Sequence, residues 1–433
     1  MPMKPACAAA LAVLLAALPA AAAGRLSFED LIANLKSPNA KTRQEAAVEL
    51  GKSRRREAVA PLAALVRDPE EKVRLEVVRA LRELRDLSAV PALVTSLADG
   101  DPRIREESIG TLVELYAERQ RETPVGRFLD MFSDEFDRAS VPAYSTVDPS
   151  VLSGLTSTLK DESASLREAA ALALGILDGR SALPQLKEAL QDPEPRVRGA
   201  AATAIGKIGT TEDGVSLIPL VSDASAGARN RALYALGVLR VREAGPALRQ
   251  LYDDNRRREP GLRVLETLSR IADPAQADLF RELVADADPE RRRLAIEGLG
   301  RVSDPELLPA FKKDFQREKN DEVRSAYAFA LVLLGDRAFI DTIVLALPSR
   351  LQGSRARRYI VELGRGLLPD LYPYLNDPDA DVRAELCDVL AQLGDAEAIP
   401  RVEPLIADPS AKVADRANRA VERLKRLQAG RVQ

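Results

Sequence analysis

The stretch DPEEKVRLEVVRALRELRD, residues 68–86, carries the pattern from which the fold can be predicted. Asp68 can accept hydrogen bonds from the free amides at the start of a helix, and the proline after it fits a first helical turn. Apolar residues then recur at helical spacing, at Val73, Val77 and Leu81. The stretch therefore predicts one helix that begins at the Asp-Pro pair and carries a single apolar stripe.

The same pattern returns along the chain at intervals of about 31 residues or twice that length. An arginine slot recurs in these copies at Arg43, Arg74, Arg105, Arg167, Arg198, Arg229, Arg292, Arg324 and Arg383. A shorter predicted helix with a proline near its start precedes the patterned one. Since neither helix can bury its apolar stripe alone, the sequence predicts helix pairs that stack on one another.

These copies share an Asp-Pro turn, a following Val-Arg and an Ala-Leu-x-x-Leu-Gly ending, and they resemble the short HEAT-like repeats named for phycobilisome lyases. The resemblance covers about residues 26–428. It implies an all-α fold, a right-handed α-solenoid (superhelix) of about 12 HEAT-like helix pairs. On this basis repeats 1–3 are expected over 24–117 and the later repeats over 149–428, with a tail at 429–433.

In HEAT-like families the arginine of one repeat meets the turn aspartate of a neighbour, which implies a ladder of ion pairs along the stack. Seven copies contain both residues: Asp68 and Arg74, Asp99 and Arg105, Asp161 and Arg167, Asp192 and Arg198, Asp223 and Arg229, Asp286 and Arg292, Asp377 and Arg383. A ladder is a network, so we expect it to stabilise the stack more than isolated exposed pairs do. The alternative is a row of arginines that binds anions.

The first 23 residues differ from the rest of the chain. Lys4 precedes the apolar run ACAAALAVLLAALPAAAA, whose last small residues stand before Gly24. This order is typical of a secretory signal peptide over 1–23. The run is short for a membrane span, and Cys7 lies at its start and not just after it, so a lipoprotein is not indicated. We therefore expect an exported protein, periplasmic or secreted, with no integral membrane span in the mature chain.

The composition restricts the chemistry that the chain can perform. There is no histidine, which excludes histidine-based catalytic triads, imidazole metal sites and histidine bases. The 63 Lys+Arg and 66 Asp+Glu nearly balance, so no global basic field attracts nucleic acid. Cys387 falls inside a helical pattern, where a buried, inert thiol is expected. We expect no catalytic residue, no cofactor and no metal, and we expect a monomer.

Residues 118–148 interrupt the repeats. Phe128, Met131, Phe132 and Phe136 fall on one face of a helical pattern, but later prolines prevent an ordinary second helix. Two interpretations are open. The segment is either a degenerate repeat whose aromatic side chains pack on the stack, or a docking element whose aromatic side chains meet a partner.

Residues 348–366 form the most one-sided charge patch of the chain, with five arginines and a single glutamate. Arg350, Arg355, Arg357 and Arg358 belong to it. A solvated helix face is one interpretation. The other is a surface that meets an acidic protein or anionic headgroups.

These observations favour an exported, non-catalytic scaffold or adaptor that binds proteins along the concave face of the solenoid. The expected partners are proteins of the cell envelope, with no nucleic acid. The alternative is a lyase- or chaperone-like activity, which rests on analogy with HEAT-like bilin lyases alone.

Overall fold

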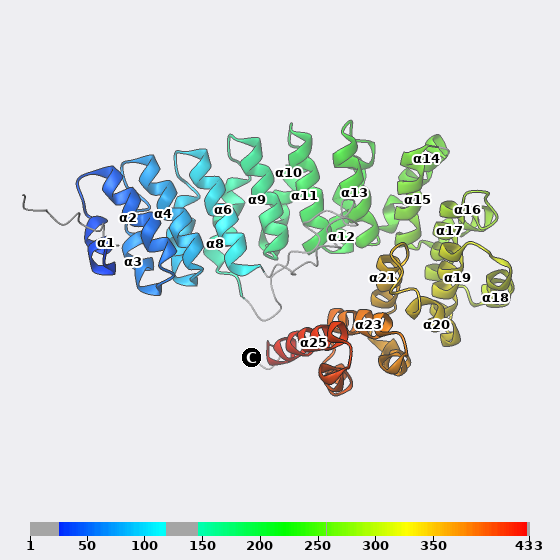
Figure 1. Ribbon diagram of the computed structural model, residues 1–433. Helices are drawn as coiled ribbons and strands as arrows, with labels where there is room; N and C mark the ends of the chain where they lie inside the picture. Colours follow the sequence, from blue (N-terminus) through cyan, green and yellow to red (C-terminus); the bar gives the residue numbers. More distant parts are fainter. Residues whose placement is uncertain (1–25, 118–145, 257, 431–433) are drawn as a thin grey trace, which may run out of the picture. The chain divides into compact units, whose positions relative to one another are not determined.

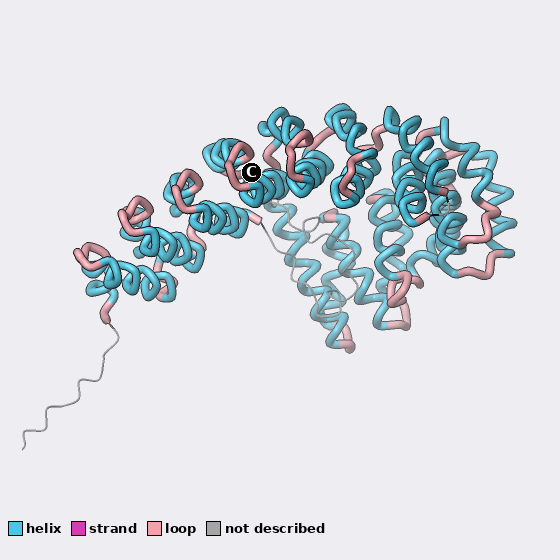
Figure 2. The backbone as a smooth tube through the Cα atoms, turned by 90° about the horizontal axis from the view of Figure 1, so that it is seen from above, coloured by secondary structure: helices cyan, strands magenta, loops and turns pink. Residues whose placement is uncertain are grey.

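A computed structural model describes residues 26–117, 146–256 and 258–430, and every regular element in these ranges is a helix (Figure 1). Short loops join successive helices into pairs (Figure 2). The chain forms two compact units, residues 1–84 and 85–433.

The first unit contains two helix pairs: α1 (Phe28–Asn34) with α2 (Ala40–Lys52), and α3 (Val59–Ala63) with α4 (Glu71–Leu84). The second helices of these pairs, α2 and α4, lie side by side. A Cβ at Gly51 would stand 2.8 Å from the Cα of Ala80, so this close approach requires a glycine. Leu50 and Leu81 are fully buried between the pairs.

The second unit contains ten pairs. Its first helices are α5 (Val90–Ser96), α8 (Pro149–Thr158), α10 (Leu183–Ala189), α12 (Thr211–Gly214) continued by η5 (Val215–Ser222), α14 (Gly245–Asn255), α16 (Ala277–Leu283), α18 (Leu308–Arg317), α20 (Ile340–Val344), α22 (Leu368–Leu371) continued by η11 (Tyr372–Asn376), and α24 (Ile399–Val402) continued by η13 (Glu403–Ala407). Its second helices are α6 (Pro102–Tyr116), α9 (Ala164–Ile176), α11 (Pro195–Ile208), α13 (Ala226–Val238), α15 (Glu259–Ile271), α17 (Pro289–Val302), α19 (Asp321–Leu333), α21 (Gly353–Leu363), α23 (Ala380–Leu393) and α25 (Ala411–Gly430). The described residues thus contain twelve pairs, which confirms the predicted all-α repeat solenoid.

Most of the Asp-Pro pairs that follow a first helix lie just before the second helix, not at its first residue. α4 begins at Glu71, and Asp68 accepts a hydrogen bond from the amide of Glu70 at 2.9 Å. The expectation that Asp68 caps α4 itself is therefore wrong. Its carboxylate instead accepts a hydrogen bond within the turn that precedes α4. It also accepts hydrogen bonds from the neighbouring repeat.

The stack passes directly from α6 to α9, which pack side by side. Arg105 of α6 pairs with Asp161 before α9, with 2.8 Å between Nε and Oδ2. A Cβ at Gly154 of α8 would lie 2.7 Å from a methyl group of Leu97. The repeats that flank residues 118–145 are therefore direct neighbours, while the segment itself, with Phe128, Met131, Phe132 and Phe136, lies outside the described residues.

The ion-pair ladder is a repeated bidentate contact. In each of the pairs below, Nε and Nη2 of the arginine lie 2.7–3.0 Å from the two carboxylate oxygens of the aspartate in the next repeat. The pairs are Arg43 with Asp68, Arg105 with Asp161, Arg167 with Asp192, Arg198 with Asp223, and Arg383 with Asp408. The third nitrogen, Nη1, donates to a backbone carbonyl of the arginine's own turn. One guanidinium thereby joins two successive turns.

The ladder is interrupted where the arginine slot, the fourth residue of a second helix, holds an apolar residue. Leu262 of α15 and Ala356 of α21 occupy it, so Asp286 and Asp377 accept no bidentate arginine from the preceding repeat among the described residues. Arg292 turns to Glu318, with 3.4 Å between Nε and Oε2. Arg229 bonds the backbone carbonyls of Asp223 and its neighbour. A continuous ladder through Asp286 and Asp377 was expected, and the structure corrects that expectation.

Removing one ladder arginine should destabilise the repeats on both sides of it. We expect Arg198→Ala to lower the free energy of unfolding by about 1.5–3 kcal/mol, because Asp223 loses a charged bidentate donor in a shielded site. Denaturant unfolding combined with hydrogen exchange of the α11 and α13 amides measures this. Arg242→Ala, at an exposed arginine without an ion pair among the described residues, should stay within about 0.5 kcal/mol. Equal effects of the two changes would contradict a stabilising ladder.

Acid should weaken the same contact. The Arg198 guanidinium holds the pKa of Asp223 below its ordinary value. A carboxylate whose pKa is lower in the folded state contributes stability above its unfolded pKa of about 3.9 and loses it as pH falls further. The difference between wild type and Arg198→Ala should therefore shrink below about pH 4.

Candidate functional site

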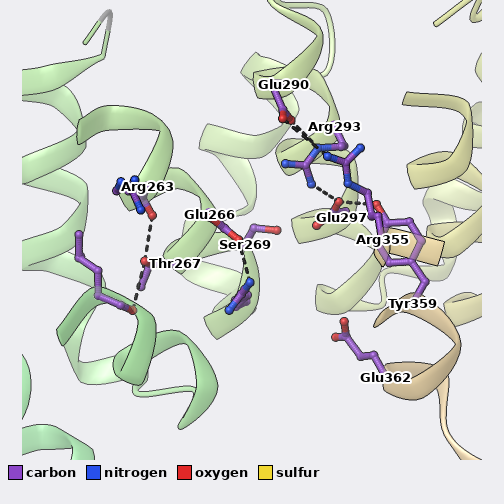
Figure 3. A network of polar contacts seen from close by, with 12 residues as sticks. Arg263, Glu266, Thr267, Ser269, Glu290, Arg293, Glu297, Arg355, Tyr359 and Glu362 are labelled. Atoms are coloured by element: carbon purple, nitrogen blue, oxygen red, sulfur yellow. Dashed lines mark hydrogen bonds and ion pairs between the residues drawn. The ribbon is translucent and has the colours of Figure 1, made fainter. Parts of the chain in front are cut away.

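The most connected polar site of the second unit lies where α17 and α21 meet across α19. We call it the α17–α21 cluster; it comprises Glu290, Arg293, Glu297 and Arg301 of α17 with Arg355, Tyr359 and Glu362 of α21. Figure 3 shows side chains of the two helices pointing toward each other. The Tyr359 ring stacks on Phe329 of the intervening helix α19, with 4.3 Å between ring centroids.

The start of α21 lies against the loop that precedes it. The first helix of this pair, α20, has 5 residues, as α3 has in the first unit. α21 then begins at Gly353, where a Cβ would stand 2.3 Å from the carbonyl oxygen of Leu347. Only glycine permits this close approach.

Glu297 is a buried carboxylate at the centre of the cluster. Arg293, Arg301 and the hydroxyl of Tyr359 all donate hydrogen bonds to it. Burial by itself raises the pKa of Glu297, but the two guanidiniums and the tyrosine hydroxyl outweigh burial and hold the pKa below its ordinary value. Glu297 is therefore a charged, fully satisfied group, and it joins α17 to α21.

A second carboxylate, Glu362, extends the cluster to two earlier repeats. Arg301 donates to both of its oxygens, at 2.8 and 3.0 Å. Arg240, at the end of α13, donates to it at 3.4 Å. Arg301 also donates to the hydroxyl of Ser269 on α15 at 2.8 Å. Four second helices are thus tied together, although Arg240 and Glu362 are 122 residues apart in the sequence.

A polar cleft of about 380 Å³ adjoins this contact. Its lining residues are Thr211, Arg240, Arg242, Glu243, Ile271, Ala272 and Arg301. Three guanidiniums and one carboxylate lie in this lining. The cleft is therefore suited to an anionic group more than to a cationic one.

The arginines of the predicted 348–366 patch have different environments. Arg355 pairs with Glu322 at 3.0 Å, and Arg357 pairs with Glu385 of α23. These two are engaged within the protein, which corrects the expectation of one uncompensated patch. Arg350 and Arg358 are exposed and form no ion pair with the described residues.

Arg358 lies close to other cations of the second helices. The guanidiniums of Arg270 and Arg355 lie near enough to Arg358 to repel its charge. The site therefore holds surplus positive charge at its exposed rim.

Sequence reasoning missed Glu297, Arg301, Tyr359 and Glu362 as a unit. The one available signal was a glutamate inside the regular pattern RRRLAIEGLGRV, where the stripe is otherwise apolar. Its partners on α21 could not be identified, since no repeat rule places residues 61 or 62 positions apart in contact.

Comparison with known families agrees with this fold. A model of HEAT repeats matches residues 28–118, 152–237 and 245–332, more than half of the chain. The chain therefore belongs to the HEAT-repeat family. No curated protein gives a significant match.

Several solved structures are similar at low scores. An engineered protein from the Northeast Structural Genomics Consortium is 18% identical over 92% of this chain and 98% of its own, with a TM-score of 0.39. The complex of CpcE and CpcF of phycocyanin lyase from Nostoc sp. PCC7120 is 22% identical over 65% and 97%, with a TM-score of 0.30. YibA of Escherichia coli is 17% identical over 63% and 92%, with a TM-score of 0.41.

Other features bear on the chemistry of the described ranges. No helix there is both long and apolar enough to cross a bilayer. The same ranges hold no group of three or more carboxylate, thiol or imidazole side chains placed to bind a metal ion. Cys387 is buried in α23, and burial raises the pKa of its thiol to about 12.

Breaking the α17–α21 cluster should cost more than breaking a ladder pair. We expect Glu297→Ala to lower the free energy of unfolding by about 3–5 kcal/mol, since it leaves two buried guanidiniums without their carboxylate. Tyr359→Phe keeps the ring on Phe329 and removes one donor, so it should cost about 1–3 kcal/mol. Hydrogen exchange of the α17 and α21 amides reports both changes.

The exposed Glu243 provides the matched control. Glu243→Ala removes a carboxylate that forms no ion pair with the described residues, and it should stay within about 0.5 kcal/mol. A loss of protection after Glu297→Ala no larger than in this control would show that the cluster does not hold α21 against α17.

Proposed function

We propose that this protein is an exported, non-catalytic scaffold that binds other proteins along the concave face formed by its second helices. Membership of the HEAT-repeat family supports this proposal, because stacked helix pairs present one long continuous face. The observation that carries it is an exposed apolar ridge on α13. Tyr234 and Val238 are 44% and 46% exposed, one helical turn apart. Exposed aromatic and aliphatic side chains on one face are typical of a protein contact.

The neighbouring second helix supports the same face. Arg231 of α13 donates to the hydroxyl of Thr203 on α11 at 3.3 Å. Both side chains are half-buried, so α11 and α13 offer a joined polar and apolar surface. The short first helices, by contrast, use most of their apolar residues to cover the core.

The proposed export rests on the first 23 residues. The full chain should lose them on secretion, which leaves Gly24 as the new N-terminus. Mass spectrometry of the protein from fractionated cells measures this. A variant with Val13→Arg and Leu14→Arg should keep its full length and stay in the cytoplasm, because the apolar run is interrupted. An uncut wild-type chain in the cytoplasmic fraction would contradict export.

Position-specific crosslinking tests the scaffold role. A photoreactive amino acid at Val238, on the second-helix face, should give discrete protein adducts in the native cell. The same group at Glu188, exposed on the first helix α10, is the matched control and should give few. Equal adducts from both positions, or none from Val238, would contradict binding along the second helices.

A further inference from the structure

A basic surface with an apolar ridge surrounds the α13 end of the second-helix face. We call it the α13–α21 surface, and it comprises Tyr234, Val238, Arg240 and Arg242 from α13 and the turn after it, Arg270 of α15, and Arg358 of α21. Tyr234 and Val238 supply its apolar part. The four arginines supply its charge.

α13 and α15 are close enough to act as one wall. A Cβ at Gly237 would stand 3.3 Å from both Cβ and Cδ of Arg270, so the stem of Arg270 lies along α13. The Arg270 guanidinium lies 5.1 Å from the centre of the Tyr234 ring. This cation–π contact holds the ring and the charge side by side.

α21 supplies the opposite wall. Glu362 reaches Arg240, and Arg358 stands one helical turn before Glu362 on the same face of α21. Arg358 also lies near enough to Arg270 for the two cations to repel each other. The exposed ridge of α13 and the free guanidinium of α21 therefore belong to one surface.

Of the three carboxylates beside this surface, Glu243 forms no ion pair with the described residues and the other two are already committed. Glu266 pairs with Arg270 at 2.7 Å, and Glu362 accepts both nitrogens of Arg301. Arg242 and Arg358 pair with no carboxylate of the described residues, and the Arg240 side chain is 58% exposed. Surplus positive charge thus remains, although the whole chain carries a net charge of −3.

We propose that the α13–α21 surface binds an acidic segment of a partner protein that also carries an apolar side chain. Arg358, Arg240 and Arg242 receive the carboxylates, which guanidinium groups recognise in a bidentate manner. Tyr234 and Val238 receive the apolar side chain. The cleft of about 380 Å³ beside Arg240 and Arg242 has room for a carboxylate side chain. This inference rests on the proposed scaffold function and gives the chemistry of its partner.

The charge pattern favours an acidic peptide over a nucleic acid. A phosphate backbone needs an uninterrupted run of cations. Here Glu243, Glu266 and Glu362 lie between the arginines. These carboxylates repel a continuous polyanion but leave room for separate side-chain carboxylates.

Fluorescence anisotropy with the full mature chain tests the inference. The probe is a fluorescein-labelled peptide of alternating Glu and Leu, and the same peptide with Lys in place of Glu is its counterpart. We expect the Glu peptide alone to bind, more weakly as salt rises. Arg358→Gln should weaken binding at least about tenfold, and Tyr234→Ala about threefold or more. Arg350→Gln is the matched control, because it removes an exposed, unpaired arginine elsewhere, and it should change nothing.

Each other outcome overturns the inference. It fails if the Glu peptide does not bind at about 1 mM, if Arg358→Gln acts like Arg350→Gln, or if a single-stranded oligonucleotide binds more tightly than the peptide. Circular dichroism confirms that each variant is folded. If crosslinks from Val238 persist in the Arg358→Gln variant, the acidic-partner inference is overturned and the scaffold function stays intact. If the wild-type protein gives no crosslinks from Val238, both are overturned.

Discussion

The constraint on which this structure depends is that no helix pair can bury its own apolar stripe. First helices such as α3 and α20 have 5 residues each, too short to persist alone. They are stable because Leu62 and Ile343 are buried against neighbouring helices. Each repeat therefore exists only as part of a stack. The Arg–Asp ladder links the stacked repeats, since one guanidinium binds both the turn of its own repeat and the turn of the next repeat.

In the second unit, the ladder and the α17–α21 cluster join different sets of repeats. Up to Asp223, bidentate pairs join successive repeats. From α15 to α21 the slot lacks its usual pairing, and in these helices Glu297 and Glu362 join repeats that are not sequence neighbours. One kind of contact is local and periodic, and the other is long-range and occurs once. The proposed binding surface lies beside the second kind, where the exposed Tyr234, Val238 and Arg358 come from different repeats.

Much of the fold could be predicted because its determinants recur. The slot that holds Arg167 and Arg198 identifies the period, and the helical spacing of Val73, Val77 and Leu81 identifies the buried face. The binding-site prediction was less accurate. It treated Arg355 and Arg357 as one free patch with Arg358, whereas the structure pairs the first two with Glu322 and Glu385. Charge in a sequence window shows how many arginines are present, but their partners lie on other helices.

The sequence by itself determined the repeat and the helix-pair architecture, because both depend on residues at a constant spacing. Its resemblance to HEAT-like repeats implied the Arg–Asp contact between adjacent turns. The sequence also determined that histidine chemistry is absent. Only the tertiary structure decided that the repeats on either side of 118–145 are neighbours, and that α21 passes α19 to reach Glu297. The physical reason is that Tyr359 and Glu297 are 62 positions apart in the chain, and no local pattern encodes which distant side chain will meet Tyr359.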